Sequence, residues 1–282
     1  MEKNGQFLLM NRVEFKAWVE SQKFTREITL VQQHHTYSPS YKGFTGKNHI
    51  NLLNAMKNYH VNERGWSDIA QNITIFPDGK IAVCRPFDNA PAGINGANKT
   101  GICIENIGNF DAGADTMTAE HEESIIYVNA VLCMKYGLTP NENSIVYHHW
   151  YDLNTGVRID DNTSGHSTKT CPGSYWFGGN TVIKAKVNFI PLIENKIAEL
   201  KGKTSTPSIP TTTTAILRKG SKGSDVKTLQ TKLNKLGYKL VVDGDFGSGT
   251  LDAVISFQNK NGLIADGIVG SNTWNTINKL AK

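Results

Sequence analysis

The chain has 282 residues, of which 39% are hydrophobic and 20% charged, values that are ordinary for a globular protein of one or two domains. Its four cysteines, Cys84, Cys103, Cys133 and Cys171, are too few for a disulfide scaffold, and the first three lie in apolar runs where we expect buried free thiols. The net charge of +5 is concentrated near the C-terminus, since residues 215–282 hold 10 Lys and Arg against 5 Asp. This charge favours either an acidic polymer as a partner or a solvated Lys-rich helix surface.

The first ten residues contain a single short apolar stretch, residues 7–10. The core of a signal peptide needs about 7–15 apolar residues and a membrane span needs about 20, so this stretch is too short for either. We therefore expect a protein that is made as a soluble cytoplasmic product without a signal peptide, so that any export uses another route.

Hydrophobic periodicity predicts four helices in the first 200 residues, at 12–20, 49–60, 118–136 and 181–200. The third has Thr118 at its N-cap and Gly137 directly after its end, as helix boundaries favour. Runs of β-branched and apolar residues predict strands at 28–31, 73–76, 80–85, 100–107 and 144–147. Strands that alternate with helices in this way predict an α/β fold with a mixed central sheet flanked by helices.

Two histidine pairs and one cysteine carry the strongest chemical signal. His34–His35 follows the first predicted strand, His148–His149 follows the last, and Cys171 lies in a polar loop. Zinc prefers imidazole and thiolate ligands, and a catalytic zinc site takes three protein ligands and leaves one position for water. Consecutive side chains on a strand point to opposite faces, so each pair can supply only one ligand. The spacing does not determine which histidine of each pair is the ligand. The alternative to a zinc site is that these are ordinary histidines and that Cys171 is a buried thiol.

Glu105 lies in the otherwise apolar strand at residues 100–107. Burial of an unpaired charge is costly, so this carboxylate needs either a function or a partner. Perturbed carboxylates gather at functional sites, which favours a catalytic role, and a salt bridge at the edge of the sheet is the alternative. The polar segment at residues 151–166 also has two possible roles: it contacts the substrate, or it is a spacer.

Residues 201–214 have almost no apolar content and contain two prolines. Such a composition cannot form a core and is typical of an extended linker. We therefore predict three parts: a catalytic domain at 1–200, a Pro/Thr-rich linker at 201–214 and a second domain at 215–282.

The second domain contains an internal repeat. The stretch that begins with Asp243–Gly244 recurs 23 residues later from Asp266–Gly267, and each copy leads into a helix. In each copy a threonine, Thr250 or Thr273, is placed to cap that helix. A third helix precedes the repeat, so we expect a small three-helix domain. Its predicted core contains Leu233, Phe257 and Trp274.

These motifs, in this order, resemble those of the zinc-dependent N-acetylmuramoyl-L-alanine amidases, the family that includes phage amidases and animal peptidoglycan-recognition proteins. The resemblance covers roughly residues 25–195. It rests on His34–His35–Thr36, Gly65–Trp66–Ser67–Asp68–Ile69, Pro77–Asp78–Gly79–Lys80–Ile81, Ile104–Glu105–Asn106–Ile107–Gly108–Asn109–Phe110, a strand leading to His148, and Lys169–Thr170–Cys171–Pro172–Gly173. Residues 217–280 resemble the peptidoglycan-binding domain found at the ends of wall hydrolases.

Carried over residue by residue, the resemblance implies that His34, His148 and Cys171 are zinc ligands. It also implies that Glu105 transfers the proton and that Lys169 stabilises the oxyanion. One position departs from the pattern. Many relatives have a tyrosine near the metal where this chain has Gln71, which cannot act as an acid or base.

The resemblance implies a peptidoglycan hydrolase that cleaves the amide bond between N-acetylmuramic acid and the L-alanine of the stem peptide with a zinc-bound water. It further implies a bacteriolytic endolysin or autolysin that acts on the cell wall after holin-dependent or other non-classical release. We expect peptidoglycan as the partner, with no nucleic acid and no membrane span. A non-catalytic peptidoglycan receptor and a zinc peptidase acting within the stem peptide are the alternatives.

Overall fold

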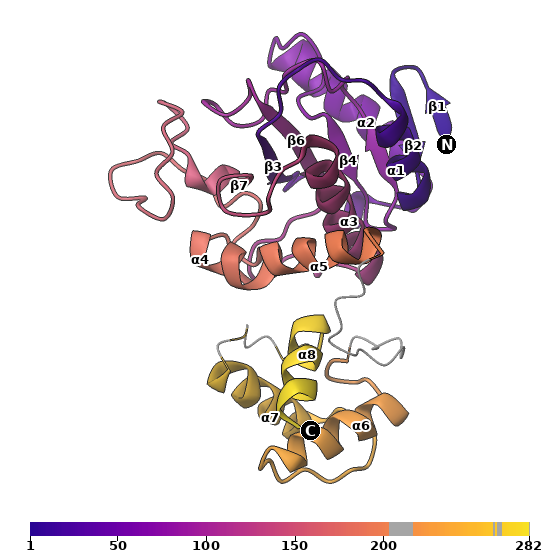
Figure 1. The fold of residues 1–282 in the computed structure, drawn as a ribbon, viewed down its shortest axis with the longest axis vertical. Helices are drawn as coiled ribbons and strands as arrows, with labels where there is room; N and C mark the ends of the chain where they lie inside the picture. The colour runs from indigo at the N-terminus through magenta and orange to yellow at the C-terminus, as the bar shows by residue number, and fades with distance from the viewer. Residues whose placement is uncertain (203–216, 262, 264–266, 282) are drawn as a thin grey trace. The chain divides into compact units, whose positions relative to one another are not determined.

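The computed structural model describes residues 1–202, 217–261, 263 and 267–281 (Figure 1). The chain divides into two compact units, Met1–Ser205 and Thr206–Lys282, called here the N-terminal unit and the C-terminal unit. All but the first two residues of the predicted linker lie outside the described residues. In the described part of the chain, no helix has the length and apolar character that a membrane crossing requires.

The N-terminal unit is built on one mixed sheet, as predicted, which has seven strands, two more than were predicted. The strands are β1 (Glu2–Asn4), β2 (Phe7–Met10), β3 (Leu30–His35), β4 (Ile73–Ile75), β5 (Ile81–Val83), β6 (Gly101–Asn106) and β7 (Ile145–Tyr147). They lie in the order β1-β2-β5-β4-β6-β3-β7. The β3 strand is central to the argument because it pairs in parallel with both β6 and β7, so that the carboxyl ends of all three strands meet at one edge.

Helices cover both faces of this sheet (Figure 1). They are α1 (Arg12–Ser21), α2 (His49–Asn58), α3 (Ala119–Tyr136), α4 (Val182–Lys184) and α5 (Ile190–Leu200). Single helical turns are formed by Tyr41–Gly43, Tyr59–Glu63, His148–Trp150, Trp176–Gly178 and Ala185–Phe189. Consecutive residues of β5 face opposite sides of the sheet. Ile81 belongs to the core that includes residues of α1, α3 and α5, whereas Ala82 belongs to the core that includes residues of α2. The predicted α/β architecture is confirmed.

Local capping signals explain why the longest helix begins and ends where it does. The hydroxyl of Thr118 accepts a hydrogen bond from the backbone N–H of His121, and Gly137 ends α3 with a left-handed backbone at φ 66°. The strands predicted at 73–76 and 80–85 are present as β4 and β5, which form an antiparallel pair. Cys84, Cys103 and Cys133 are buried free thiols, as expected.

Three predictions about local structure were wrong or incomplete. The sequence interpretation missed β1 and β2, which are stabilised by pairing with each other and, through β2, with β5 rather than by a local pattern. Strand alternation was applied to both histidine pairs, but β7 ends at Tyr147 and His148 begins a 3₁₀ turn. The last helix is not uniform, because the π turn Ala185–Phe189 separates α4 from α5.

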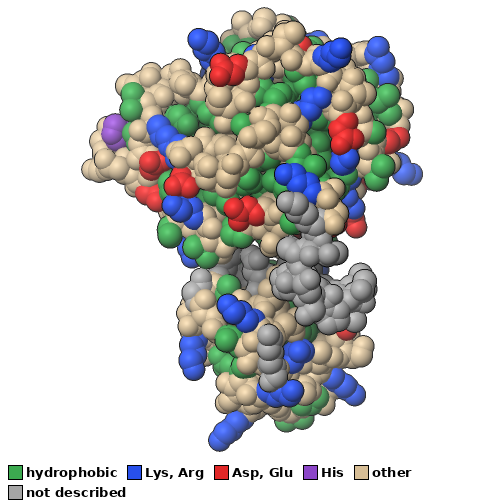
Figure 2. Space-filling view, in the orientation of Figure 1, with side chains coloured by type: hydrophobic (Ala, Val, Ile, Leu, Met, Phe, Trp, Pro, Cys, Tyr) green, Lys and Arg blue, Asp and Glu red, His purple; other side chains and the backbone are tan. Residues whose placement is uncertain are grey.

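The C-terminal unit contains α6 (Ser224–Lys235), α7 (Ser248–Lys260) and α8 (Ser271–Leu280), the three predicted helices. Leu233, Phe257 and Trp274 lie in its core, as predicted. Lys and Arg side chains are spread over the face of this unit that Figure 2 displays.

The capping prediction for the repeat was wrong. The N-caps are Gly247 and Gly270, which place Thr250 and Thr273 inside the first turn of α7 and α8. In the first copy, the amide of Gln230 donates to the Thr250 hydroxyl and accepts from the backbone N–H of Gly244. In the second copy, Gln258 makes the same two contacts with Thr273 and Gly267. Each repeat is therefore held by a buried glutamine from the preceding helix. Asp266, with which the second copy begins, lies outside the described residues.

Candidate active site

The candidate site lies at the edge where β3, β6 and β7 end, in a cavity of about 790 Å³. Two features of the sheet bring its residues together. In the parallel register of β3 and β6, His34 lies directly opposite Glu105. On the other side of β3, His148 is the first residue after the end of β7. All three residues line the cavity, together with Lys169 and Cys171.

The side chains of His34, His148 and Cys171 converge on one point. The Nδ1 atoms of the two imidazoles are 3.1 Å apart, and the Cys171 Sγ lies 3.6 Å from the His34 Nδ1. All three side chains are buried, and their ligand atoms lie within 4.8 Å of one another. These residues form a possible His/Cys metal site.

The spacing of these atoms fits a tetrahedral zinc ion. Zinc bonds of about 2.0–2.3 Å in tetrahedral geometry separate the ligand atoms by about 3.3–3.6 Å, and the separations here are 3.1 and 3.6 Å. Three protein ligands would leave a fourth position for water or substrate, and all three residues line the cavity. The donor set and its geometry therefore suit a catalytic zinc more than a closed structural one.

The protonation states suit a cation as well. Burial lowers the pKa of His34 well below its ordinary value and that of His148 to about 3, so both rings are neutral and can present lone pairs. Burial, with the nearby Glu105 carboxyl, raises the pKa of the Cys171 thiol. A thiolate at this position therefore needs a cation beside it, which a metal ion supplies.

The second histidine of each pair makes a different contact. The His35 Nδ1 accepts a hydrogen bond from the backbone N–H of Phe110 at 3.1 Å. The His149 Nδ1 lies 2.8 Å from the backbone carbonyl of Lys169, to which it donates. Each pair thus contributes one imidazole to the cluster, although for His148 this follows from a 3₁₀ turn and not from strand alternation.

The Cys171 turn is held tightly against the loop that follows β6. The carboxylate of Asp111 accepts hydrogen bonds from the Thr170 hydroxyl at 3.0 Å and from the Ser174 backbone N–H at 2.9 Å. Gly173 has φ 129°, and a β-carbon there would lie 2.4 Å from the carbonyl oxygen of Phe110. Only glycine allows this approach, which explains its position two residues after the cysteine.

Glu105 faces the cluster from the neighbouring strand. A carboxylate oxygen of Glu105, the Cys103 sulfur and a ring nitrogen of His34 all lie within 4.8 Å of one another. Burial raises the pKa of Glu105 to about 8, although the positive charge of Lys169 acts to lower it. Within the described residues Glu105 forms no ion pair, so the sheet-edge salt bridge considered above is not formed.

A further part of the cavity wall was not predicted to belong to the site. It includes Tyr59, His60, Arg64 and Trp66, which come from the π turn after α2 and the loop that follows it. The His60 ring stacks on Trp66 at 5.0 Å, and the Arg64 guanidinium lies 5.6 Å from the same indole. The concentration of aromatic and basic residues in this short stretch was the available signal.

Gln71, where many relatives have tyrosine, does not face the cavity. Its side chain is fully buried and donates a hydrogen bond to the Thr74 hydroxyl at 2.9 Å. The cavity is lined instead by the preceding residue, Ala70. Gln71 thus makes an interior contact and supplies no group to the candidate site.

Comparison with known proteins identifies a family for each unit. Residues 24–174 match the N-acetylmuramoyl-L-alanine amidase family, and residues 222–277 match a peptidoglycan binding domain. The chain is 25% identical over 272 residues to N-acetylmuramoyl-L-alanine amidase CwlL of Bacillus licheniformis, covering 92% of this chain and 69% of that protein. A second relative from the same organism is 26% identical over 250 residues, covering 86% of this chain and 64% of its own length.

Among solved structures, Drosophila PGRP-LB is 20% identical with a TM-score of 0.44, covering 59% of this chain and 84% of that one. The two curated relatives are longer than this chain, which spans about two thirds of their length. The amidase match itself extends over more than half of the chain. This protein therefore belongs to the N-acetylmuramoyl-L-alanine amidase family and carries a peptidoglycan-binding domain beside its amidase domain.

Proposed function

We propose that the protein is a zinc-dependent peptidoglycan hydrolase that cleaves the amide bond between N-acetylmuramic acid and L-alanine during lysis of bacterial walls. The observation that carries this proposal is the convergence of two imidazoles and one thiol at a cavity into which Glu105 and Lys169 also project. We assign His34, His148 and Cys171 as the metal ligands, and Glu105 and Lys169 as the catalytic residues.

The chemistry follows from the positions of these groups. A zinc ion bound by the three ligands would polarise the scissile carbonyl and make a water molecule more acidic. Glu105 accepts the proton of the attacking water at its carboxylate and returns it to the amine that leaves. Burial raises its pKa to about 8, and a cation bound beside it would lower that pKa, so that the carboxylate form needed to accept a proton is available near neutral pH. Lys169 presents an ammonium group at the same cavity, where it stabilises the negative charge that develops on the carbonyl oxygen.

The C-terminal unit would hold the enzyme on its substrate. We propose that the catalytic domain comprises residues 1–200, the linker 201–214 and the peptidoglycan-binding domain 215–282. The division of the chain between Ser205 and Thr206 and the domain match at 222–277 support these bounds. Weak wall binding by this unit raises the effective concentration of the active site near its substrate.

The experiment that tests the metal assignment compares buried cysteines within one unit. Purified wild-type protein should contain one zinc ion per chain by elemental analysis, and Cys171→Ser should lose it, since a hydroxyl is a far poorer ligand than a thiolate. Cys133→Ser is the matched control because Cys133 is equally buried but lies in α3, within the hydrophobic core. Full zinc content in Cys171→Ser would remove that residue from the site.

His35→Ala tests the choice within the first histidine pair. The variant should retain zinc, whereas His34→Ala should lose it, because only the His34 imidazole lies in the cluster. Loss of zinc in His35→Ala together with retention in His34→Ala would reverse the assignment.

A further inference from the structure

The two turns that carry His148 and Cys171 come from separate parts of the chain, and several hydrogen bonds hold them together. The backbone N–H of His149 donates to the carbonyl of Cys171 at 2.7 Å, and the His149 ring donates to the carbonyl of Lys169. These bonds link the turns directly. A further residue, Asn180, links them from outside.

Asn180 contacts both turns with different atoms. Its backbone carbonyl accepts a hydrogen bond from the indole Nε1 of Trp150 at 2.7 Å, two residues after His148. Its side-chain Nδ2 donates to the carbonyl of Thr170 at 2.9 Å, one residue before Cys171. Asn180 is only 9% exposed, so water does not substitute readily for either contact.

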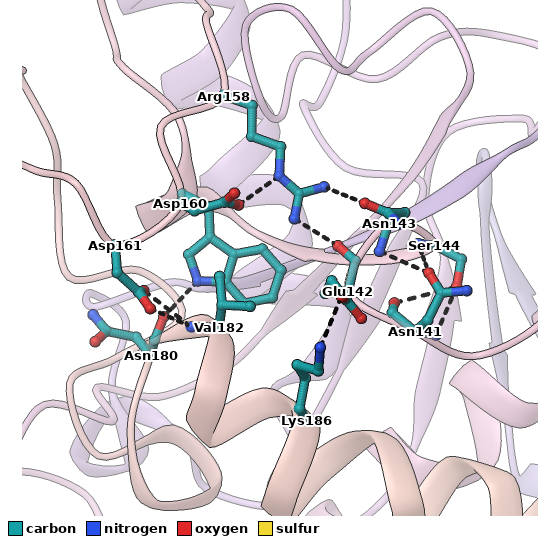
Figure 3. Close-up of polar contacts among 11 residues, drawn as sticks. Asn141, Glu142, Asn143, Ser144, Arg158, Asp160, Asp161, Asn180, Val182 and Lys186 are labelled. Atoms are coloured by element: carbon teal, nitrogen blue, oxygen red, sulfur yellow. Dashed lines mark hydrogen bonds and ion pairs between the residues drawn. The ribbon is translucent and has the colours of Figure 1, made fainter.

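Trp150 is itself held firmly in place. The indole is fully buried, its ring stacks on Tyr147 at 4.5 Å, and the guanidinium of Arg158 lies 5.4 Å from its ring centre. Arg158 is in turn bound by Asp160, Asn143 and the Glu142 carbonyl (Figure 3). The His148 turn is therefore a rigid support.

The segment that carries Asn180 is fixed on its other side as well. Asp161 accepts a hydrogen bond from the backbone N–H of Val182 at 2.9 Å (Figure 3). The N–H of Gly179 donates to the Trp176 carbonyl at 2.8 Å. Asn180 thus reaches the Cys171 turn from a fixed backbone, and its amide donates to the carbonyl next to the ligand.

We propose that Asn180 is a positioning residue that holds the Cys171 turn against the His148 turn and so sets the separation of the Cys171 sulfur from the two imidazoles. The proposal rests on the zinc site assigned above. Residues that orient metal ligands through hydrogen bonds typically change metal affinity 10- to 100-fold when they are mutated. Asn180 acts on the backbone beside the ligand, so we expect an effect of about 10-fold.

The test measures zinc affinity, which a residue with a purely structural role would leave unchanged. Asn180→Leu keeps the number and branching of the side-chain heavy atoms and removes the donor. Competition with a chromophoric chelator should give a zinc dissociation constant raised about 10-fold, and the full-length protein is used throughout. Trp150→Phe, which removes the indole N–H at the other end of the link together with part of the buried ring, should weaken zinc binding in the same direction.

Asn234→Leu provides the matched control. Asn234 also donates through Nδ2 to a backbone carbonyl, that of Leu240 at 2.8 Å, but it lies in the C-terminal unit. This variant should bind zinc as the wild type does. The thermal unfolding of each metal-free variant is measured in parallel.

Two results separate failure of this inference from failure of the proposed function. Wild-type zinc affinity in Asn180→Leu, including the case in which only its metal-free unfolding temperature falls, would overturn the positioning role alone. Wild-type protein that binds no zinc would overturn the zinc site and, with it, this inference.

Discussion

Two buried amides beside the candidate site lead to a quantitative prediction about stability. Gln33, the residue before His34 in β3, faces Asn129 of α3, and both side chains are fully buried. The Gln33 Nε2 donates to the Asn129 Oδ1 at 2.7 Å, and the Asn129 Nδ2 donates back to the Gln33 Oε1 at 3.3 Å. This pair joins the longest helix to the strand that carries His34.

Asn129→Leu should destabilise the N-terminal unit by about 2–6 kcal/mol. The change leaves the donor and the acceptor of the Gln33 amide buried without partners, and each such group costs about 1–3 kcal/mol. Replacement of both partners by apolar residues of similar shape can be nearly neutral. Gln33→Met combined with Asn129→Leu should therefore be about 2 kcal/mol more stable than the sum of the single changes predicts.

Urea unfolding of the metal-free proteins measures these free energies. Tryptophan fluorescence is a suitable signal, because four of the five tryptophans, all but Trp274, lie in the N-terminal unit. We expect the double variant to lose less free energy of unfolding than the two single variants lose together. A double variant whose loss equals the sum of the two single losses would show that the amide pair does not act as a unit.

Three further predictions concern catalysis, acid stability and wall binding. Glu105→Gln should keep its zinc but lose about 10²-fold or more in turnover of a soluble muropeptide; near-normal turnover would place proton transfer elsewhere. Hydrogen bonds from the backbone N–H groups of Thr155 and Ser167 hold the pKa of Asp152 well below its ordinary value. Its contribution to stability is therefore present above about pH 4 and is lost as the pH falls further, so the gap in Tm between wild type and Asp152→Asn should shrink from pH 6 to pH 3. A gap that is constant or grows would contradict this. A chain ending at Gly202 should turn over soluble muropeptide normally but lose activity on intact walls, and equal activity of both chains on walls would make the C-terminal unit dispensable.

Much of the fold could be predicted because its signals are local. Thr118 and Gly137 mark the ends of α3, and the Pro77–Asp78–Gly79 turn marks the hairpin of β4 and β5. The strands β1 and β2 carry no comparable signal, since all three residues of β1 are exposed and β2 is stabilised by β5, a partner distant in sequence. The last helix was predicted as one piece because a π turn preserves helical periodicity to within one residue.

The sequence could predict which residues belong to the candidate site, but not how they approach one another. The motifs pointed to His34, His148 and Cys171, but their approach depends on the register of β3 with β6 and β7, which spacing along the chain does not determine. The same holds for Asn180, whose sequence neighbourhood is rich in glycine and carries no chemical signal. Its importance appears only once Trp150 and Thr170 are seen to contact it from two directions.

The bond that the enzyme cleaves tests the account most directly. Digestion of purified peptidoglycan by the zinc-loaded protein should release new N-terminal L-alanine without new reducing sugar ends, because the described residues of the candidate site combine two imidazoles and a thiol with one carboxylate and lack the paired carboxylates of a glycosidase. New amino groups on residues deeper in the stem peptide would favour a zinc peptidase. Absence of any release from wall preparations would favour a peptidoglycan receptor, and new reducing ends would contradict the amidase assignment outright.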